Sequence, residues 1–286
     1  MEVRFRLLDV FTEVPFAGNQ LCVVPEPPAE LTPEQMHTIT REIGFSETTF
    51  VTSTGGDRYT VRIFTPVEEL PFAGHPTLGT AFTLVSEGRV RTPVVQTTAV
   101  GEVPVEVDVA AGFAWMVQRP PQFRGEYHDR GTLARATGLT VEDLHPNLPA
   151  QVVSTGLGPL IVPIRDEAAL RRAEREGRAC AKACEESGGA ELYLFAIRGD
   201  GDVMARMFDP TVVIGEDPAT GSAAGPLGAY LAARGLAGMP GRATVSQGEM
   251  VGRPSFLHLD VAPAGDSWTV RVGGGVQIVG AGSFRL

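Results

Sequence analysis

Glu47 places a carboxylate on the mostly apolar face of an expected strand, Phe45 to Val51. Alternate residues of a strand share a face, so Glu47 falls on the same face as Phe45, Thr49 and Val51. A carboxylate on such a face loses solvation, which raises its pKa toward the range useful for proton transfer. The pattern predicts a general acid or base at Glu47. The alternative is an edge-strand glutamate that faces water.

Two short motifs each bring the chain from a loop into a run of small and apolar residues typical of a buried helix. The loops end at Gly74-His75 and Gly221-Ser222, and the expected helices cover Thr77 to Val85 and Ala223 to Ala233. Helix N-termini present unpaired N–H groups and a positive dipole end, which bind anions. His75 and Asp217 add titratable groups beside these junctions. The alternative for Ser222 is simple N-capping.

The residues upstream of the two motifs also correspond. Val61-Arg62-Ile63-Phe64-Thr65-Pro66 is echoed by Ala205-Arg206-Met207-Phe208-Asp209-Pro210, with Phe64 and Phe208 lying 144 residues apart. A period of half the chain is far longer than the 20 to 50 or so residues of a solenoid repeat. We therefore expect two similar domains, residues 1–117 with a returning C-terminal strand 278–286, and residues 118–277. Their two loop-to-helix junctions are candidates for one shared cleft.

The local patterns predict an α+β fold of two pseudo-symmetric domains, each a mainly antiparallel sheet wrapped around a central helix. Thr32, Pro33, Gln35 and Gly44 carry the start and stop signals of a helix ending at Ile43. Pro120, Pro121 and the polar residues up to Arg130 are expected to be a crossing between domains. The other expected elements are strands at Arg4–Val10, Leu21–Val24, Phe45–Thr52 and Tyr59–Phe64, β structure over Val94–Gln118 and Gln151–Pro163 with Val103, Val105, Val107 and Val109 inward, a short helix from Leu133, and short strands at Thr244–Val251, Phe256–Val261, Trp268–Val272 and Val276–Val279.

The composition and net charge of the chain limit the classes of function that it can have. The 286 residues are 43% hydrophobic and 20% charged, which is typical of a soluble globular protein, and the formal net charge is −10. This charge disfavours nucleic acid and anionic membranes as partners. The charged first ten residues do not resemble a signal peptide, and no apolar run is long enough for a membrane span, so a cytoplasmic location is expected.

The three cysteines, Cys22, Cys180 and Cys184, are too few for a disulfide framework. Cys180 and Cys184 are spaced to share one helix face. No histidine is close to them in sequence, so a surface helix is expected there rather than a metal site.

Four motifs together resemble the phenazine-biosynthesis isomerase-like family, over nearly the whole chain and in the expected order. They are Phe11-Thr12 with Pro15-Phe16-Ala17-Gly18-Asn19, Phe45-Ser46-Glu47-Thr48-Thr49-Phe50-Val51, Phe72-Ala73-Gly74-His75-Pro76-Thr77, and Glu216-Asp217-Pro218-Ala219-Thr220-Gly221-Ser222-Ala223. The last motif is highly specific. One departure is Gln20, where the family commonly has proline.

The resemblance implies the diaminopimelate-epimerase-like fold, with an active site between two pseudo-symmetric halves, and a homodimer. Epimerases of that fold have a cysteine at each helix N-terminus; His75 and Ser222 stand there instead, which excludes two-thiol racemisation. The resemblance implies Glu47 as general acid/base with His75 and Asp217 in the catalytic site. It implies substrate binding by Asn19, Gly74, Gly221 and Ser222.

The leading hypothesis is therefore a cofactor-independent, metal-free isomerase or epimerase that moves a proton on a small carboxylate-bearing substrate. A hydrolase or acyl-transferase using Ser222 is an alternative, although Gly221-Ser222-Ala223-Ala224-Gly225 lacks the Gly-x-Ser-x-Gly elbow. Nucleotide binding is disfavoured because neither a P-loop nor a dinucleotide fingerprint is present. A non-catalytic binding protein is a further alternative, and the sequence does not identify the substrate.

Overall fold

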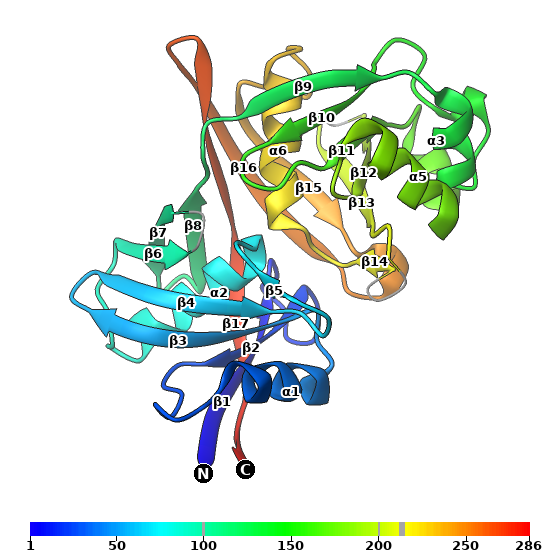
Figure 1. Cartoon of the computed structure of the whole chain (residues 1–286). Helices are drawn as coiled ribbons and strands as arrows, with labels where there is room; N and C mark the ends of the chain where they lie inside the picture. Colours follow the sequence, from blue (N-terminus) through cyan, green and yellow to red (C-terminus); the bar gives the residue numbers. More distant parts are fainter. Residues whose placement is uncertain (99–100, 200, 212–214) are drawn as a thin grey trace. The chain divides into compact units, whose positions relative to one another are not determined.

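The computed structural model describes residues 1–98, 101–199, 201–211 and 215–286. The chain divides into two compact units: unit 1 is Met1–Val117 with Gly273–Leu286, and unit 2 is Gln118–Val272. The chain thus leaves unit 1 after Val117 and returns to it at Gly273. Figure 1 shows the elements of both units.

Unit 1 contains two helices and a set of strands that includes the C-terminal part of β17. Its elements are β1 (Glu2–Val10), β2 (Asn19–Val24), α1 (Pro33–Ile43), β3 (Glu47–Gly55), β4 (Arg58–Phe64), β5 (Glu69–Leu70), α2 (Gly74–Ser86), β6 (Val94–Thr98), β7 (Gly101–Asp108), β8 (Phe113–Val117) and β17 (Ser267–Arg285). Of the β structure expected over Val94–Gln118, residues 99 and 100 lie outside the described residues.

The strands of unit 1 close into a ring. Pairing runs β1–β2–β3–β4–β6–β7–β8–β17 and returns from β17 to β1. Two of these pairs, β2–β3 and β4–β6, are parallel, and each is connected through a helix, α1 or α2. The pairs β1–β17, β1–β2, β3–β4, β6–β7 and β7–β8 are antiparallel, so the expectation of a mainly antiparallel sheet is confirmed.

Helix α2 lies inside this ring, where it packs against β1, β2, β3, β6, β7 and β8. Its residues Gly74 to Leu84 are all buried, and none of them is an Asp, Glu, Lys or Arg that would need a solvent-facing side. Figure 1 shows β3 and β4 passing in front of α2 and α1 lying on the outside of β2 and β3. The capping box of Thr32 with Gln35 and the left-handed Gly44 are both present, as the sequence predicts.

Strand β17 corrects one expectation. The sequence predicts separate short strands at Trp268–Val272 and Val276–Val279, but β17 continues through Gly273, Gly274 and Gly275 from Ser267 to Arg285. These glycines allow close approach rather than a turn: a Cβ at Gly274 would lie 2.4 Å from Phe11 Cδ1, and one at Gly273 would lie 2.5 Å from Trp115 Cδ2. The Gly275 carbonyl also accepts the Phe11 N–H at 2.7 Å.

Unit 2 repeats this plan with more helices. Its elements are β9 (Gln122–Tyr127), α3 (Arg130–Ala136), a 3₁₀ turn (Val141–Asp143), β10 (Ala150–Ser154), β11 (Leu160–Pro163), α4 (Glu167–Arg172), α5 (Gly177–Ser187), β12 (Leu192–Ile197), β13 (Val203–Phe208), β14 (Glu216–Asp217), α6 (Gly221–Ala232), β15 (Gly241–Gln247), a second 3₁₀ turn (Glu249–Val251) and β16 (Ser255–Ala264).

The pairings of unit 2 match those of unit 1 strand by strand. β10–β11 is antiparallel, β11–β12 parallel through α4 and α5, β12–β13 antiparallel and β13–β15 parallel through α6. Helix α6 is buried along its whole length and packs against β10, β11, β15 and β16. Phe64 and Phe208 end β4 and β13, and Gly74 and Gly221 begin α2 and α6. The expected α+β class, with sheets around a central helix, is confirmed.

Three local expectations are wrong. Residues 122–127 form β9, which pairs with β10, rather than a plain crossing. Val109 is 45% exposed because β7 ends at Asp108 and a turn follows, in which the Ala111 N–H donates to Asp108 Oδ1 at 3.0 Å. Val251 belongs to a 3₁₀ turn and not to a strand.

Cys180 and Cys184 do share one face of α5, as their spacing predicts. That face is buried in an apolar cluster with residues such as Leu133 and Leu170, so the expected surface helix presents its other side to solvent. Both cysteines, like Cys22, are buried and outside any disulfide.

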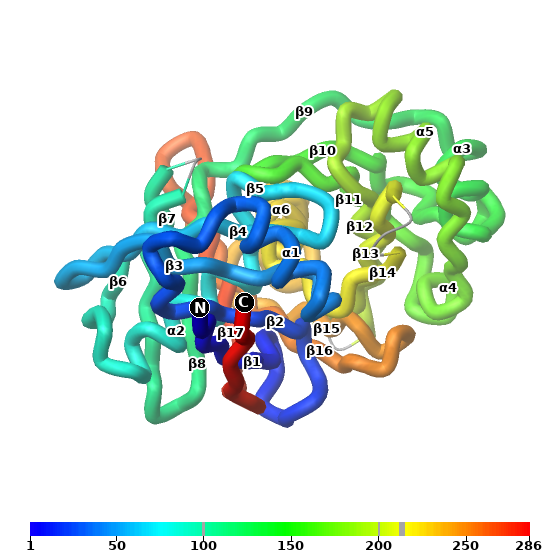
Figure 2. Tube along the Cα trace, turned by 60° about the horizontal axis from the view of Figure 1, so that its bottom comes forward, coloured from blue at the N-terminus to red at the C-terminus, as the bar shows by residue number. Residues whose placement is uncertain are grey.

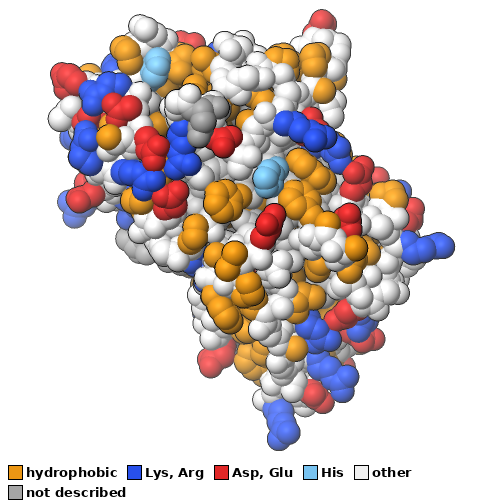
Figure 3. All heavy atoms as spheres, turned by 180° about the vertical axis from the view of Figure 1, so that it is seen from behind, with side chains coloured by type: hydrophobic (Ala, Val, Ile, Leu, Met, Phe, Trp, Pro, Cys, Tyr) orange, Lys and Arg blue, Asp and Glu red, His pale blue; other side chains and the backbone are white. Residues whose placement is uncertain are grey.

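The two chain ends lie side by side in unit 1, as Figure 2 shows, and the Met1 ammonium donates to the Leu286 carbonyl at 2.7 Å. Figure 3 shows basic and acidic side chains interspersed on one face of the protein. Within the described residues, none of the helices combines the length and the apolar content that crossing a bilayer requires.

Candidate functional site

Unit 1 brings three of the expected site residues together: Asn19, Glu47 and His75. Asn19 begins β2 and Glu47 begins β3. Because β2 and β3 are parallel neighbours, with Leu21 opposite Glu47, both strands start at the same end of the ring. The crossover through α1 therefore places residues from two distant segments at one edge.

The packing of α2 explains why His75 reaches this edge. Leu21 of β2 contacts α2 at Gly79, where a Cβ would lie 2.5 Å from Leu21 Cδ2. Asn19 lies two strand residues before Leu21, about 6.6 Å along β2 and on the same face. His75 lies four helix residues before Gly79, about 6 Å along α2 and on the same face. The two spacings match, so the Leu21 contact brings Asn19 opposite His75.

Glu47 reaches His75 by the same geometry. Thr49 of β3 meets Thr80 of α2, with 2.8 Å between their hydroxyl oxygens. Glu47 shares the face of Thr49 and therefore points toward α2, as the strand periodicity predicts. Strand β3 begins at Glu47 rather than at Phe45, so Glu47 lies at the mouth of the ring and not within it.

The contacts at this cluster form a short chain of polar groups. Glu47 Oε2 lies 3.4 Å from His75 Nε2. His75 Nδ1 lies 3.2 Å from Asn19 Nδ2, and the Ser46 hydroxyl donates to Asn19 Oδ1 at 3.3 Å. The side chains of His75 and Glu47 are only 5% and 12% exposed.

Burial shifts the acid–base behaviour of Glu47. Loss of solvation on burial raises the pKa of this carboxyl to about 7. A carboxyl with such a pKa exchanges protons readily near neutral pH, because both of its forms are populated there. The arrangement can therefore take a proton from a weakly acidic carbon and return it.

Unit 2 holds Asp217 in a separate buried network at the start of α6. The Thr220 hydroxyl donates to Asp217 Oδ2 at 2.5 Å, and Gln247 Nε2 donates to the Asp217 carbonyl at 2.8 Å. Gln247 in turn accepts from Tyr193, whose hydroxyl lies 2.9 Å from Oε1. The Thr220 bond orients the Asp217 side chain, and the Gln247 bond holds its backbone.

The two central helices begin in the same way. Gly74 and Gly221 are their first residues, and the side chain of the N-cap residue, Ala73 or Thr220, makes no capping hydrogen bond in either helix. The N-cap of α6 is Thr220, with Ser222 at the second helical position, so capping does not explain Ser222. Gln118 Nε2 donates to the Gly221 carbonyl at 2.8 Å and steadies this end of the helix.

Sequence reasoning missed Ser46, Thr220 and Gln247 as parts of these networks. Ser46 lies in the motif Phe45–Val51 and Thr220 in the motif Glu216–Ala223. Their position in these motifs could have identified both hydroxyls as site residues. Gln247 lies on β15, far from the motif in sequence, and only the parallel pairing of β15 with β13 brings that strand into the network's sheet. In the described part of the chain, His, Cys, Asp and Glu side chains form no group of three or more suited to a metal ion.

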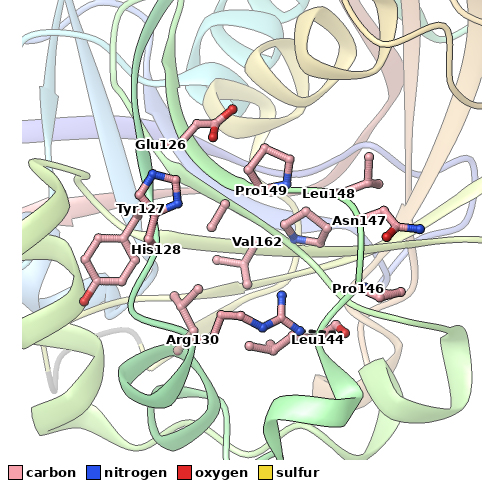
Figure 4. A pocket seen from close by; sticks show the side chains of 13 residues that line it. Glu126, Tyr127, His128, Arg130, Leu144, Pro146, Asn147, Leu148, Pro149 and Val162 are labelled. Carbon is pink, nitrogen blue, oxygen red and sulfur yellow. Dashed lines mark hydrogen bonds between the residues drawn. The ribbon is translucent and has the colours of Figure 1, made fainter.

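A cavity of about 420 Å³ lies elsewhere in unit 2, between β9, β10 and the loop that follows the first 3₁₀ turn. Figure 4 shows Glu126, His128, Arg130 and Asn147 around an apolar floor that includes Val162. The Arg130 guanidinium is bound by backbone carbonyls, among them His145 at 3.0 Å. None of the expected site residues lines this cavity.

The chain belongs to the phenazine biosynthesis-like protein family, whose family model matches residues 8–282. The proteins of this family that it resembles are isomerases, and the chain is an isomerase of this class. The family resemblance stated from the four motifs is thereby confirmed, as is the diaminopimelate-epimerase-like fold.

Individual relatives cover almost the entire chain. An uncharacterized isomerase from Deinococcus radiodurans is 35% identical over 95% of this chain and 91% of its own. Trans-2,3-dihydro-3-hydroxyanthranilate isomerase from Pseudomonas fluorescens is 33% identical over 98% of both chains. The solved structure of a predicted epimerase from Pseudomonas aeruginosa has 35% identity, a TM-score of 0.86 and 99% coverage of both chains. Family membership, more than local geometry, decides against the hydrolase alternative.

Proposed function

We propose that this isomerase works without a cofactor and moves a proton on a small carboxylate-bearing substrate, with Glu47 as the general acid/base. The observation that carries this proposal is the buried Glu47 carboxyl, whose pKa is raised to about 7 and which lies 3.4 Å from His75 Nε2. Glu47 takes a proton from one substrate carbon and delivers a proton to another. The double bond moves in between, so atoms and charge balance without an oxidant or reductant.

The remaining site residues bind and stabilise the substrate in this proposal. The first-turn N–H groups at Gly74 of α2 and at Gly221 and Ser222 of α6 are not capped by the N-cap side chains, and a helix N-terminus is suited to negative charge. They would hold the substrate carboxylate or the charge that develops on deprotonation. Asp217, fixed by Thr220, is the second catalytic carboxylate that the family resemblance implies.

The Pseudomonas fluorescens relative suggests the first compound to test. Its name gives trans-2,3-dihydro-3-hydroxyanthranilate, a small cyclic molecule that carries a carboxylate. We propose this compound or a related cyclic carboxylate as the substrate class.

The experiment compares wild-type protein with Glu47→Gln in deuterated water. Glutamine keeps the shape of the side chain and removes the base, so the rate should fall about a hundred- to ten-thousandfold. Proton NMR should show deuterium entering the product with wild-type protein, and no exchange with Glu47→Gln although the substrate still binds. Full turnover by a folded Glu47→Gln protein would refute the mechanism.

A further inference from the structure

Asn19 occupies a position in unit 1 that a simple substrate-binding role does not explain. Its side chain is buried, with 2% exposure of the residue, and its amide group lies between the Ser46 hydroxyl and the His75 ring. An amide has one end that accepts hydrogen bonds and one that donates them. Its orientation therefore determines which proton arrangement the imidazole can adopt.

The contacts orient this amide. The Ser46 hydroxyl donates to Oδ1 at 3.3 Å, which leaves Nδ2 facing His75 Nδ1 at 3.2 Å. Because an amide nitrogen only donates, His75 Nδ1 must accept and carries no proton. A neutral imidazole then has its proton on Nε2, the atom that lies 3.4 Å from Glu47 Oε2.

We propose that Asn19 is a positioning residue that fixes His75 in the tautomer protonated on Nε2, so that the ring presents a donor to the Glu47 carboxylate. Its catalytic consequence depends on the function proposed above. A donor at Nε2 supports the ionised, basic form of Glu47, whereas a lone pair at Nε2 would repel it. An amide donor at Nδ1 also opposes the imidazolium, which needs an acceptor there.

Asparagine differs from aspartate at this position in a way that can be measured. An aspartate has the same shape but accepts hydrogen bonds only, so it would draw a proton onto His75 Nδ1. We therefore expect Asn19→Asp to place a proton on His75 Nδ1, with almost no change in side-chain volume. Asn19→Leu removes both hydrogen bonds at similar size and should leave the ring without a fixed tautomer.

The test is ¹⁵N NMR of the histidine rings in the full-length protein without ligand, near pH 8. The chain has five histidines, and a His75→Gln variant identifies the His75 signals by their loss. Wild-type protein should show a protonated Nε2 and an unprotonated Nδ1 at His75, and Asn19→Asp should show a protonated Nδ1. Asn147→Asp, which adds the same charge to an exposed loop of unit 2, should leave the His75 signals unchanged.

Two results would overturn the proposal: a wild-type His75 protonated on Nδ1, or an Asn19→Asp protein that folds and keeps the wild-type pattern. The wild-type spectrum decides the first point even if Asn19→Asp fails to fold. Ser46→Ala gives a milder second variant, which should produce a mixture of tautomers because the amide loses its orienting partner.

Activity measurements on the Asn19 and Glu47 variants distinguish failure of this inference from failure of the proposed function. Asn19→Asp should lower kcat about ten- to a hundredfold, by analogy with the loss of partners that orient metal-bound histidines, with a much smaller change in KM. If Glu47→Gln retains turnover, the proposed function fails while the tautomer result stands. If Glu47→Gln is inactive and Asn19→Asp keeps both wild-type activity and the wild-type His75 spectrum, only the role of Asn19 fails.

Discussion

At the residue scale, the central fact is that a carboxyl group is buried beside an imidazole at the mouth of a closed sheet. Strand periodicity predicts the face on which Glu47 lies, and the contact of Thr49 with Thr80 shows that this face points toward α2. The protein thus keeps a desolvated Glu47 carboxylate at a cost in stability. This cost depends on pH and can be measured.

The pKa of Glu47 predicts the sign of that dependence. The pKa is raised from 4.5 to about 7 on folding, so the protonated carboxyl favours the folded state. Its contribution is fully present below about pH 4.5 and is lost as the pH rises through about 7. The difference corresponds to about 3 kcal/mol.

Denaturant unfolding of wild-type protein and Glu47→Gln at several pH values tests this prediction. Relative to Glu47→Gln, the free energy of unfolding of wild-type protein should fall by about 3 kcal/mol between about pH 4.5 and pH 8. A difference that stays flat over this interval would show that the folded-state pKa of Glu47 is not raised.

At the scale of the elements, the internal repeat extends to individual interactions. In unit 1, Arg62 of β4 pairs with Glu69 of β5 and lies over the Phe64 ring. In unit 2, Arg206 of β13 pairs with Glu216 of β14 and lies over the Phe208 ring. The Arg-x-Phe echo in the sequence therefore marks the same strand pair in the two units.

The glycines of β17 give a prediction about ring closure. Gly274→Ala would place a Cβ 2.4 Å from Phe11 Cδ1, so strand and side chain must shift apart, at a cost of about 1–3 kcal/mol. Gly280→Ala in the same strand is the control, because its Cβ would lie 3.5 Å from Leu7 Cδ1, an ordinary contact. Thermal and denaturant unfolding should separate the two variants, and equal stabilities would contradict the packing argument.

Helix α1 gives a second prediction at this scale. Thr32→Ala removes the side chain that accepts the Gln35 N–H at 3.3 Å and should lower the free energy of unfolding by about 1 kcal/mol. Thr38→Ala, within the same helix and on its exposed side, removes no cap and should change it by only a few tenths of a kcal/mol, because alanine is the better helix former. If Thr38→Ala proves as costly as Thr32→Ala, the capping box contributes nothing specific.

At the scale of the whole molecule, the proposal of a cofactor-independent reaction makes a simple prediction. Extensive dialysis against a chelator, followed by gel filtration, should leave the rate of isomerisation unchanged within error. Adding back divalent metals or nicotinamide and pyridoxal cofactors should not raise it. A chelator-sensitive rate that a metal restores would refute this part of the proposal.

The oligomeric state is a further prediction at this scale, drawn from the family resemblance. We propose a homodimer, so sedimentation equilibrium should give twice the 30.4 kDa mass of the chain. A mass of one chain across the micromolar range would contradict it.

The sequence by itself determined the features that depend on local chemistry and on repetition. The capping box at Thr32 predicts the start of α1, and strand alternation predicts the inward face of Glu47. The matched segments ending in Phe64 and Phe208 predict two similar strand-and-helix arrangements. These signals suffice because capping, alternation and repetition act between residues that are close in the chain or alike in type.

Only the tertiary structure decided which distant residues meet. The contact between Asn19 and His75 depends on β2 packing against α2 at Gly79, and no local pattern encodes that contact. The continuity of β17 through three glycines could likewise not be predicted from the sequence, because glycine occurs both in turns and in tightly packed strands. Here the glycines belong to a tightly packed strand, because the side chains of Phe11 and Trp115, distant in sequence, fill the space where a Cβ would be.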